Sequence, residues 1–151
     1  SKRMMLDEAI SKCYEVSDNV MIEEYIYGRE MTVGILGNKI LPIVEIVPKN
    51  GFYDYDSKYI KGKSDYIVPA KNISKDLEMN IYNNAMRIYE LIGCKHYARI
   101  DFRLSNDNKP YFLEVNTLPG FTDTSLFPMA AKAAGISYKN LLLKIINLAK
   151  K

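Results

Sequence analysis

The sequence predicts an α+β fold in which an antiparallel sheet packs against helices. In residues 97–117, two runs of alternating apolar residues flank the turn residues 105–110, which indicates a β-hairpin. Gly37-Asn38 lies between two further extended runs and is a strong signal for a second tight hairpin. Apolar residues at helical spacing near residues 74–92 and 138–150 indicate the helices that cover the sheet.

The first part of the chain is expected to form a helix followed by strands. Residues 6–16 show helical spacing, with Asp7 and Glu8 near the start, where the helix dipole favours acidic groups. A turn is expected at residues 17–19. The strands expected after it are 20–26, 30–36 and 39–47, with the last two joined at Gly37-Asn38.

Residues 48–65 interrupt this pattern with glycines, four aromatic residues and four lysines. A loop of this length is uncommon in a compact domain unless it is functional or disordered, and its aromatic content argues against disorder. Two interpretations stay open from the residues alone. The segment is either an ordered lid that carries a cation or a packed surface loop.

The second part of the chain is expected to hold a short extended segment, the hairpin and further helices. Ser74 is a suitable N-cap for a helix that runs to about residue 92, and Gly93 is a natural stop. Ser137 is expected to cap the last helix. The remaining expected elements are a short strand at 66–70, an irregular segment at 118–124, and helices at 126–134 and 138–150.

Composition is typical of one soluble domain, with 151 residues, 48% apolar and 26% charged. The net charge of +3 and the scattered lysines require no nucleic-acid partner. No apolar run approaches the roughly 18 residues of a membrane span, and Cys13 and Cys94 have neither disulfide-framework nor zinc spacing. We therefore expect a cytoplasmic protein with no membrane partner. Because the chain starts without Met, we also expect a fragment of something longer.

The hairpin at 97–117 places two acids opposite each other. A two-residue loop at Asp107-Asn108 or a four-residue loop at 106–109 pairs Asp101 with Glu114 and Arg99 with Asn116. Like charges directly opposite in a hairpin are destabilising, so a compensating group is expected. A divalent cation is one candidate. The alternative is a bent hairpin whose carboxylates point into water.

The same hairpin gathers three oxygen donors. Glu114 and Asn116 lie two residues apart and therefore share a face, and Asp101 joins them from the neighbouring strand. Such hard donors suit Mg²⁺, which completes its shell with water and phosphate. Arg99 lies on that face too, where it could stabilise a negatively charged transition state.

Other catalytic patterns are absent from the sequence. It contains no GxxxxGK[ST] or GxGxxG phosphate loop. The only histidine, His96, has no serine and acid placed to form a catalytic triad.

Four motifs together carry a resemblance: ARIDF, FLEVNTLPG, TSLFPMAAKAAG and FYDYDSKY. From about Val20 to the C-terminus, the chain resembles the D-alanine–D-alanine ligases of the ATP-grasp superfamily. The resemblance implies the ATP-grasp C-terminal subdomain and the joining of two D-alanines for peptidoglycan, the cell-wall polymer that determines cell shape. It implies ATP and two Mg²⁺ ions, with Mn²⁺ as a substitute. ATP would phosphorylate the first carboxylate, and the second amine would attack the acyl phosphate.

The resemblance also assigns roles around the hairpin. Asp101, Glu114 and Asn116 match the metal ligands, with Glu114 expected to bridge the two ions. Arg99 and the backbone amide of Gly120 match the groups that stabilise the tetrahedral oxyanion. A further pair matches the clamp on the carboxylate of the second D-alanine: Ser125 and the amide of Leu126. From the residues alone, Ser125 is also a helix N-cap and Gly120 a turn residue.

Further matching positions concern ATP. Lys58 matches a lid lysine that meets the phosphates, and Tyr59 matches a tyrosine that closes the lid. Glu30 matches the acid that binds the ribose. The positions matched to adenine are Glu23 and Ile26 through their backbone, Glu24 nearby, and Phe52 as a packing residue.

A full ligase of this kind also has an N-terminal substrate domain and a central ATP-binding segment. Residues 1–151 are therefore expected to be the C-terminal catalytic domain fragment, which folds, binds nucleotide weakly and does not turn over alone. The resemblance also implies a homodimer of the full-length enzyme. Alternatives are a D-alanine–D-lactate or another carboxylate–amine ligase, against which Tyr59 argues, and a non-catalytic module with surface carboxylates.

Overall fold

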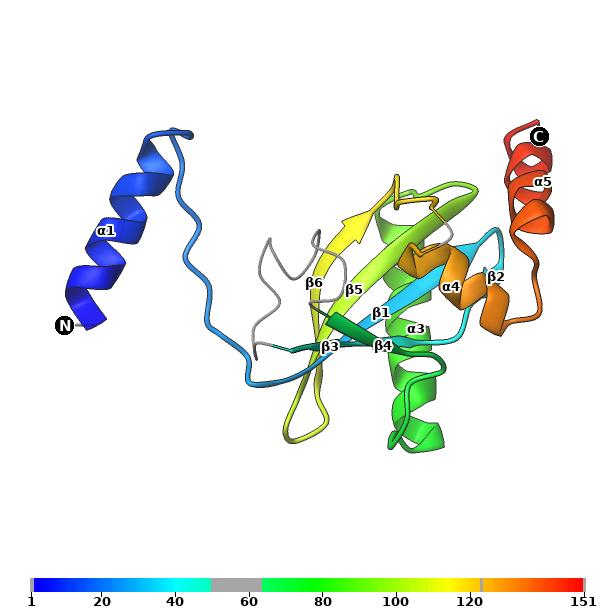
Figure 1. Ribbon diagram of the computed structural model, residues 1–151, viewed down its shortest axis with the longest axis horizontal. Helices are drawn as coiled ribbons and strands as arrows, with labels where there is room; N and C mark the ends of the chain where they lie inside the picture. The colour runs from blue at the N-terminus through cyan, green and yellow to red at the C-terminus, as the bar shows by residue number, and fades with distance from the viewer. Residues whose placement is uncertain (1, 50–63, 123, 151) are drawn as a thin grey trace.

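The computed structural model describes residues 2–49, 64–122 and 124–150, which form one antiparallel sheet with helices packed on it (Figure 1). The strands are β1 (Gly28–Leu36), β2 (Lys39–Ile40), β3 (Val44–Pro48), β4 (Ser64–Ile67), β5 (Tyr97–Ser105) and β6 (Pro110–Asn116). The helices are α1 (Lys2–Tyr14), α3 (Lys75–Leu91), α4 (Leu126–Ala133) and α5 (Tyr138–Ala149). The predicted α+β class with an antiparallel sheet is confirmed.

The sheet has the order β4-β3-β1-β5-β6, and β2 pairs with β1 beside this path. β1 and β5 form the centre and pair along their whole length, from Gly28 opposite Ser105 to Leu36 opposite Tyr97. Both strands therefore have a paired neighbour on each edge, and most of their residues are buried.

Two apolar cores lie on opposite sides of the sheet. Side chains alternate along a strand, so Met31, Val33 and Ile35 of β1 share one face and pack with α3. The second core joins Val44 of β3 to Phe127 of α4. Figure 1 shows α3 and α4 on different sides of the sheet, while α1 lies apart from the sheet and the extended segment after it runs from α1 to the start of β1.

Two strand predictions in the first half are wrong. Residues 20–26 form no strand: the segment runs from α1 toward the sheet, and none of the described strands pairs with it (Figure 1). The expected strand at 39–47 is two strands, β2 and β3. Pro42, which lacks an N–H, lies in the interruption, and β3 then pairs with β1 one residue out of the β2 register.

The β5–β6 hairpin pairs Asp101 with Glu114 and Arg99 with Asn116, as predicted. The prediction that the length of the loop alone sets this pairing is wrong. A bulge between Asp101 and Phe102 shifts the register by one residue, so that Phe102 pairs with Phe112 on the turn side. The turn and the bulge together therefore produce the pairing that the loop was expected to produce alone.

Tyr82 on α3 predicts a loss of stability at alkaline pH. Burial raises the pKa of Tyr82 to about 12, and Glu78 adds to the rise through its charge and a hydrogen bond of 3.2 Å. Because an unfolded tyrosine has a pKa of about 10, the folded chain keeps this proton longer. The stabilisation is present below about pH 10 and is lost as pH rises to about 12. In urea unfolding across this range, Tyr82→Phe is expected to lose less stability than the parent; equal losses would contradict this role.

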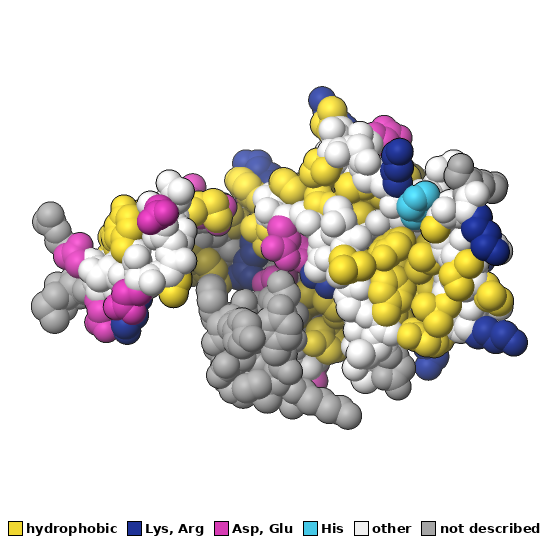
Figure 2. Space-filling model, turned by 90° about the horizontal axis from the view of Figure 1, so that it is seen from above, with side chains coloured by type: hydrophobic (Ala, Val, Ile, Leu, Met, Phe, Trp, Pro, Cys, Tyr) yellow, Lys and Arg dark blue, Asp and Glu magenta, His cyan; other side chains and the backbone are white. Residues whose placement is uncertain are grey.

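The surface shows no broad basic region on the face seen in Figure 2, where lysine and arginine side chains lie at separate points. Among the described residues, no helix combines the length and the apolar character that crossing a membrane requires.

Candidate functional site

A row of polar side chains crosses the sheet face opposite α3. Strand register places it, because Glu30 pairs with Arg103 and Thr32 with Asp101 across β1 and β5. Asp101 and Arg99 then pair with Glu114 and Asn116 across β5 and β6. The alternation that turns neighbouring residues into the α3 core turns this row to the other face.

Asp101 is fixed at the centre of the row. The Arg99 guanidinium donates to both of its carboxylate oxygens, at 2.9 Å from Nε and 2.8 Å from Nη2. The Thr32 hydroxyl donates to Asp101 Oδ1 at 2.5 Å from the neighbouring strand. Only 8% of Asp101 is exposed, so these bonds act in a desolvated position.

Thr32 is a site residue that the sequence analysis missed. Its signal in the sequence is one hydroxyl between Met31 and Val33 in a strand that is otherwise apolar from residue 31 onward. The side chain is 1% exposed and also reaches the carbonyl of Ile100 at 3.3 Å. It therefore orients Asp101 from a buried position.

Thr32→Val is expected to lower the free energy of unfolding by about 1.5–3 kcal/mol, because it removes a hydrogen bond to a charged group without changing side-chain volume. Urea unfolding of the chain measures this loss. Thr32→Ser keeps the hydroxyl and is the matched control. A valine variant as stable as the serine variant would show that the bond to Asp101 contributes nothing.

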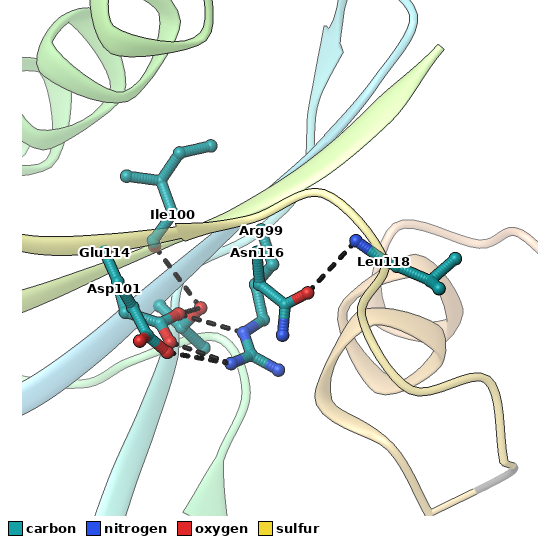
Figure 3. Close-up of polar contacts among 7 residues, drawn as sticks. Arg99, Ile100, Asp101, Glu114, Asn116 and Leu118 are labelled. Carbon is teal, nitrogen blue, oxygen red and sulfur yellow. Dashed lines mark hydrogen bonds and ion pairs between the residues drawn. The ribbon is translucent and has the colours of Figure 1, made fainter. Parts of the chain in front are cut away.

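The Arg99 guanidinium also lies 4.0 Å from Glu114, so it stands beside both of the paired carboxylates (Figure 3). The Glu114 side chain is 53% exposed, whereas that of Arg99 is 8% exposed. The sequence left the opposed charges to a divalent cation or to water. In the described structure, Arg99 supplies a positive charge next to both.

The donor set fits a hard divalent cation. The bonds from Thr32 and Arg99 use three of the roughly four acceptor positions of Asp101, which leaves one on Oδ2. Asn116 Oδ1 accepts from the Leu118 N–H at 3.1 Å, which orients the amide (Figure 3). Within residues 2–49, 64–122 and 124–150, no three His, Cys, Asp or Glu side chains cluster for a metal. The predicted set instead combines two carboxylates with an amide oxygen.

A second predicted group forms where α4 begins. Ser125 Oγ lies 2.7 Å from Thr122 Oγ1 and accepts from the Thr122 N–H at 3.1 Å. A Cβ on Gly120 would lie 2.9 Å from the same Oγ, so glycine permits this close approach. Ser125 is the N-cap of α4, as predicted, although its side chain makes no capping hydrogen bond.

The structure describes only some of the residues that were expected to bind the nucleotide. Glu30 accepts from Arg103 at 2.9 Å, and the Ile26 carbonyl accepts from the same guanidinium at 2.8 Å. Glu23 and Glu24 are exposed in the segment that is not a strand. Three predicted residues lie outside the described residues: Lys58, Tyr59 and Phe52.

Comparison with known proteins identifies one family. The model of the family "D-ala D-ala ligase C-terminus" matches residues 1–147. A D-alanine–D-alanine ligase of Methylacidiphilum infernorum is 46% identical over 144 residues, which cover 95% of this chain and 47% of that protein. The chain therefore spans about half the length of the curated relatives that it matches.

Solved structures of two ligases match the fold of this chain. The crystal structure of the Bacillus anthracis D-alanine–D-alanine ligase complexed with ATP matches with a TM-score of 0.80 and 36% identity, over 95% of this chain and 46% of that one. The VanG D-Ala:D-Ser ligase of Enterococcus faecalis matches with a TM-score of 0.80 and 34% identity, over 96% of this chain and 43% of that one.

Proposed function

Because the chain belongs to the D-alanine–D-alanine ligase family, in its C-terminal part, we propose that it forms the nucleotide- and metal-binding half of a ligase that joins two D-alanines. The reaction would consume ATP and release ADP and phosphate with D-alanyl-D-alanine. We place it in the cytoplasm, in peptidoglycan synthesis. The full ligase would add an N-terminal domain for the first D-alanine and a central ATP-binding segment, and it would act as a homodimer.

One observation supports this function above the others: the paired residues Asp101 and Glu114 bring two carboxylates together with the Arg99 guanidinium beside both. With Asn116 beside them, these oxygens would hold Mg²⁺, which when bound would offset the charge of the ATP phosphates. Arg99 would stabilise the negative charge that develops when the second amine attacks the acyl phosphate. Its bonds to Asp101 fix its position in advance, so little reorganisation is needed.

The group at α4 would bind the second D-alanine. Ser125 and the first amide of α4, that of Leu126, would hold the substrate carboxylate, since helix N-termini favour anions. The Gly120 amide would assist Arg99 at the oxyanion. Thr122 orients the Ser125 hydroxyl through a bond of 2.7 Å.

The nucleotide would lie toward the start of β1. Glu30 would bind the ribose, and the backbone of Glu23 and of Ile26 would contact adenine, with Glu24 nearby. Lys58 would meet the phosphates, Tyr59 would close the lid and Phe52 would pack beside adenine. Closure would exclude water and so protect the acyl phosphate from hydrolysis.

The choice of second substrate is the main alternative. Because VanG, a D-Ala:D-Ser ligase, has the same fold at TM-score 0.80, the fold alone does not select D-alanine. D-serine and D-lactate are therefore the second substrates that compete with D-alanine. Of the three, we propose D-alanine.

The test uses the full-length ligase that carries this chain, with ATP and Mg²⁺. Phosphate release should depend on D-alanine, and chromatography should detect D-alanyl-D-alanine in an amount equal to the phosphate. The 151-residue chain alone should show no D-alanine-dependent release. If the full-length ligase instead consumed ATP only with D-lactate or D-serine present, the alternative would replace this function. ATP consumption that does not depend on D-alanine, D-lactate or D-serine would refute the proposed function.

A further inference from the structure

We propose that Arg103 is a positioning residue for ATP binding. It fixes the Ile26 backbone and the Glu30 carboxylate, which would contact the nucleotide. This inference rests on the proposed function. Arg103 lies on β5 in the row that also contains Asp101. It is two residues beyond Asp101 and pairs with Glu30, near the start of β1. It was assigned no role from the sequence, where it is one of the charged residues in the alternating β5 run.

The Arg103 guanidinium connects two parts of the chain at once. Nε donates to the Ile26 carbonyl at 2.8 Å, and Nη1 donates to Glu30 Oε2 at 2.9 Å. Nη2 donates to the Tyr25 hydroxyl at 2.6 Å, and the guanidinium carbon lies 5.0 Å from the centre of the Tyr25 ring. One rigid planar group therefore sets the relative positions of Tyr25, Ile26 and Glu30.

These contacts form in a largely desolvated position. The side chains of Arg103 and Glu30 are 11% and 13% exposed, so the ion pair is weakly screened by solvent. None of the described strands pairs with residues 20–26, so side-chain contacts contribute to the position of this segment. Arg103 supplies such contacts at two successive residues, immediately before the chain enters β1.

The contacts determine what the segment can offer a nucleotide. The Ile26 carbonyl is directed at Arg103, so the Ile26 N–H is the backbone group that would bond to adenine. Arg103 also holds Glu30 through Oε2, and Glu30 is the acid that would bind the ribose. A lysine at position 103 would keep the charge but would not reproduce three bonds from one planar group.

The test compares Arg103→Gln and Arg103→Lys with the parent full-length ligase. Both variants are expected to raise the KM for ATP roughly tenfold, the factor that loss of one charged hydrogen bond gives. The KM for D-alanine and kcat should change less than about twofold, because Arg103 positions only the nucleotide. Arg87→Gln, an exposed arginine on α3, is the matched control and should leave all three values unchanged.

Direct binding of a fluorescent ATP analogue separates the possible failures. If the parent protein does not bind the analogue, the proposed function fails. If the parent binds it and both Arg103 variants, shown to be folded by thermal melting, bind equally well, the positioning role fails. Equal increases in the KM for ATP and for D-alanine would also overturn it, because a general loss of structure would not distinguish the substrates. If the glutamine variant does not fold, the lysine variant decides.

Discussion

Glu114→Gln is expected to reduce ligation by the full-length enzyme more than about 100-fold, because even outer partners of metal ligands contribute 10–100-fold. Glutamine keeps the volume of the side chain and removes its negative charge. The Glu114 side chain is 53% exposed, so folding does not depend on desolvating it. The variant should therefore melt at nearly the parent temperature and lose activity alone.

The measurement is the rate of D-alanine-dependent phosphate release, titrated with Mg²⁺. Partial recovery at high Mg²⁺ is expected if Glu114 acts through the metal. Glu90→Gln, an exposed acid at the end of α3, is the control and should retain the parent rate at every Mg²⁺ concentration. If Glu114→Gln ligated as fast as this control, the acid pair would be surface charge and the non-catalytic alternative would stand.

The faces of the β5–β6 hairpin could be predicted because they follow from local patterns, whereas the bulge that completes the pairing of Asp101 with Glu114 could not. Period-two alternation defines the faces of each strand, so Arg99, Asp101, Glu114 and Asn116 were expected together. The sequence placed Arg99 on the same face as Asp101 but not in contact with it. That contact depends on side-chain rotamers, which residue spacing does not determine.

Other parts of the site depend on partners distant in sequence. Residues 20–26 have the apolar content of a strand, yet a strand also needs a neighbour, and no described strand lies beside this segment. Arg103 reaches back across β1 to Ile26, and Thr32 reaches Asp101 from the neighbouring strand. These contacts become visible only when the strand order is known, because the sequence separations are large.

The second large effect is expected in the apolar core beneath α4. Phe127 is 1% exposed, and its ring lies 5.9 Å from that of Tyr97 and 5.7 Å from that of Phe121. A Cβ on Gly34 would come within 3.0 Å of the Phe127 ring, so the ring packs directly on β1. Phe127 thus packs the start of α4 against the centre of the sheet. The start of α4 also contains the proposed carboxylate-binding residues Ser125 and Leu126.

Phe127→Ala is expected to lower the free energy of unfolding by about 3–5 kcal/mol, because it removes a buried aromatic ring and leaves a cavity. Urea unfolding of the chain measures this loss. Phe112→Ala on β6 removes the same atoms from a residue that is 46% exposed, and it should cost much less. Because Ser125 and Leu126 precede Phe127 directly, a surviving full-length variant should also show a raised KM for the second D-alanine. Equal losses of stability in the two variants would show that α4 is not held to the sheet by this ring.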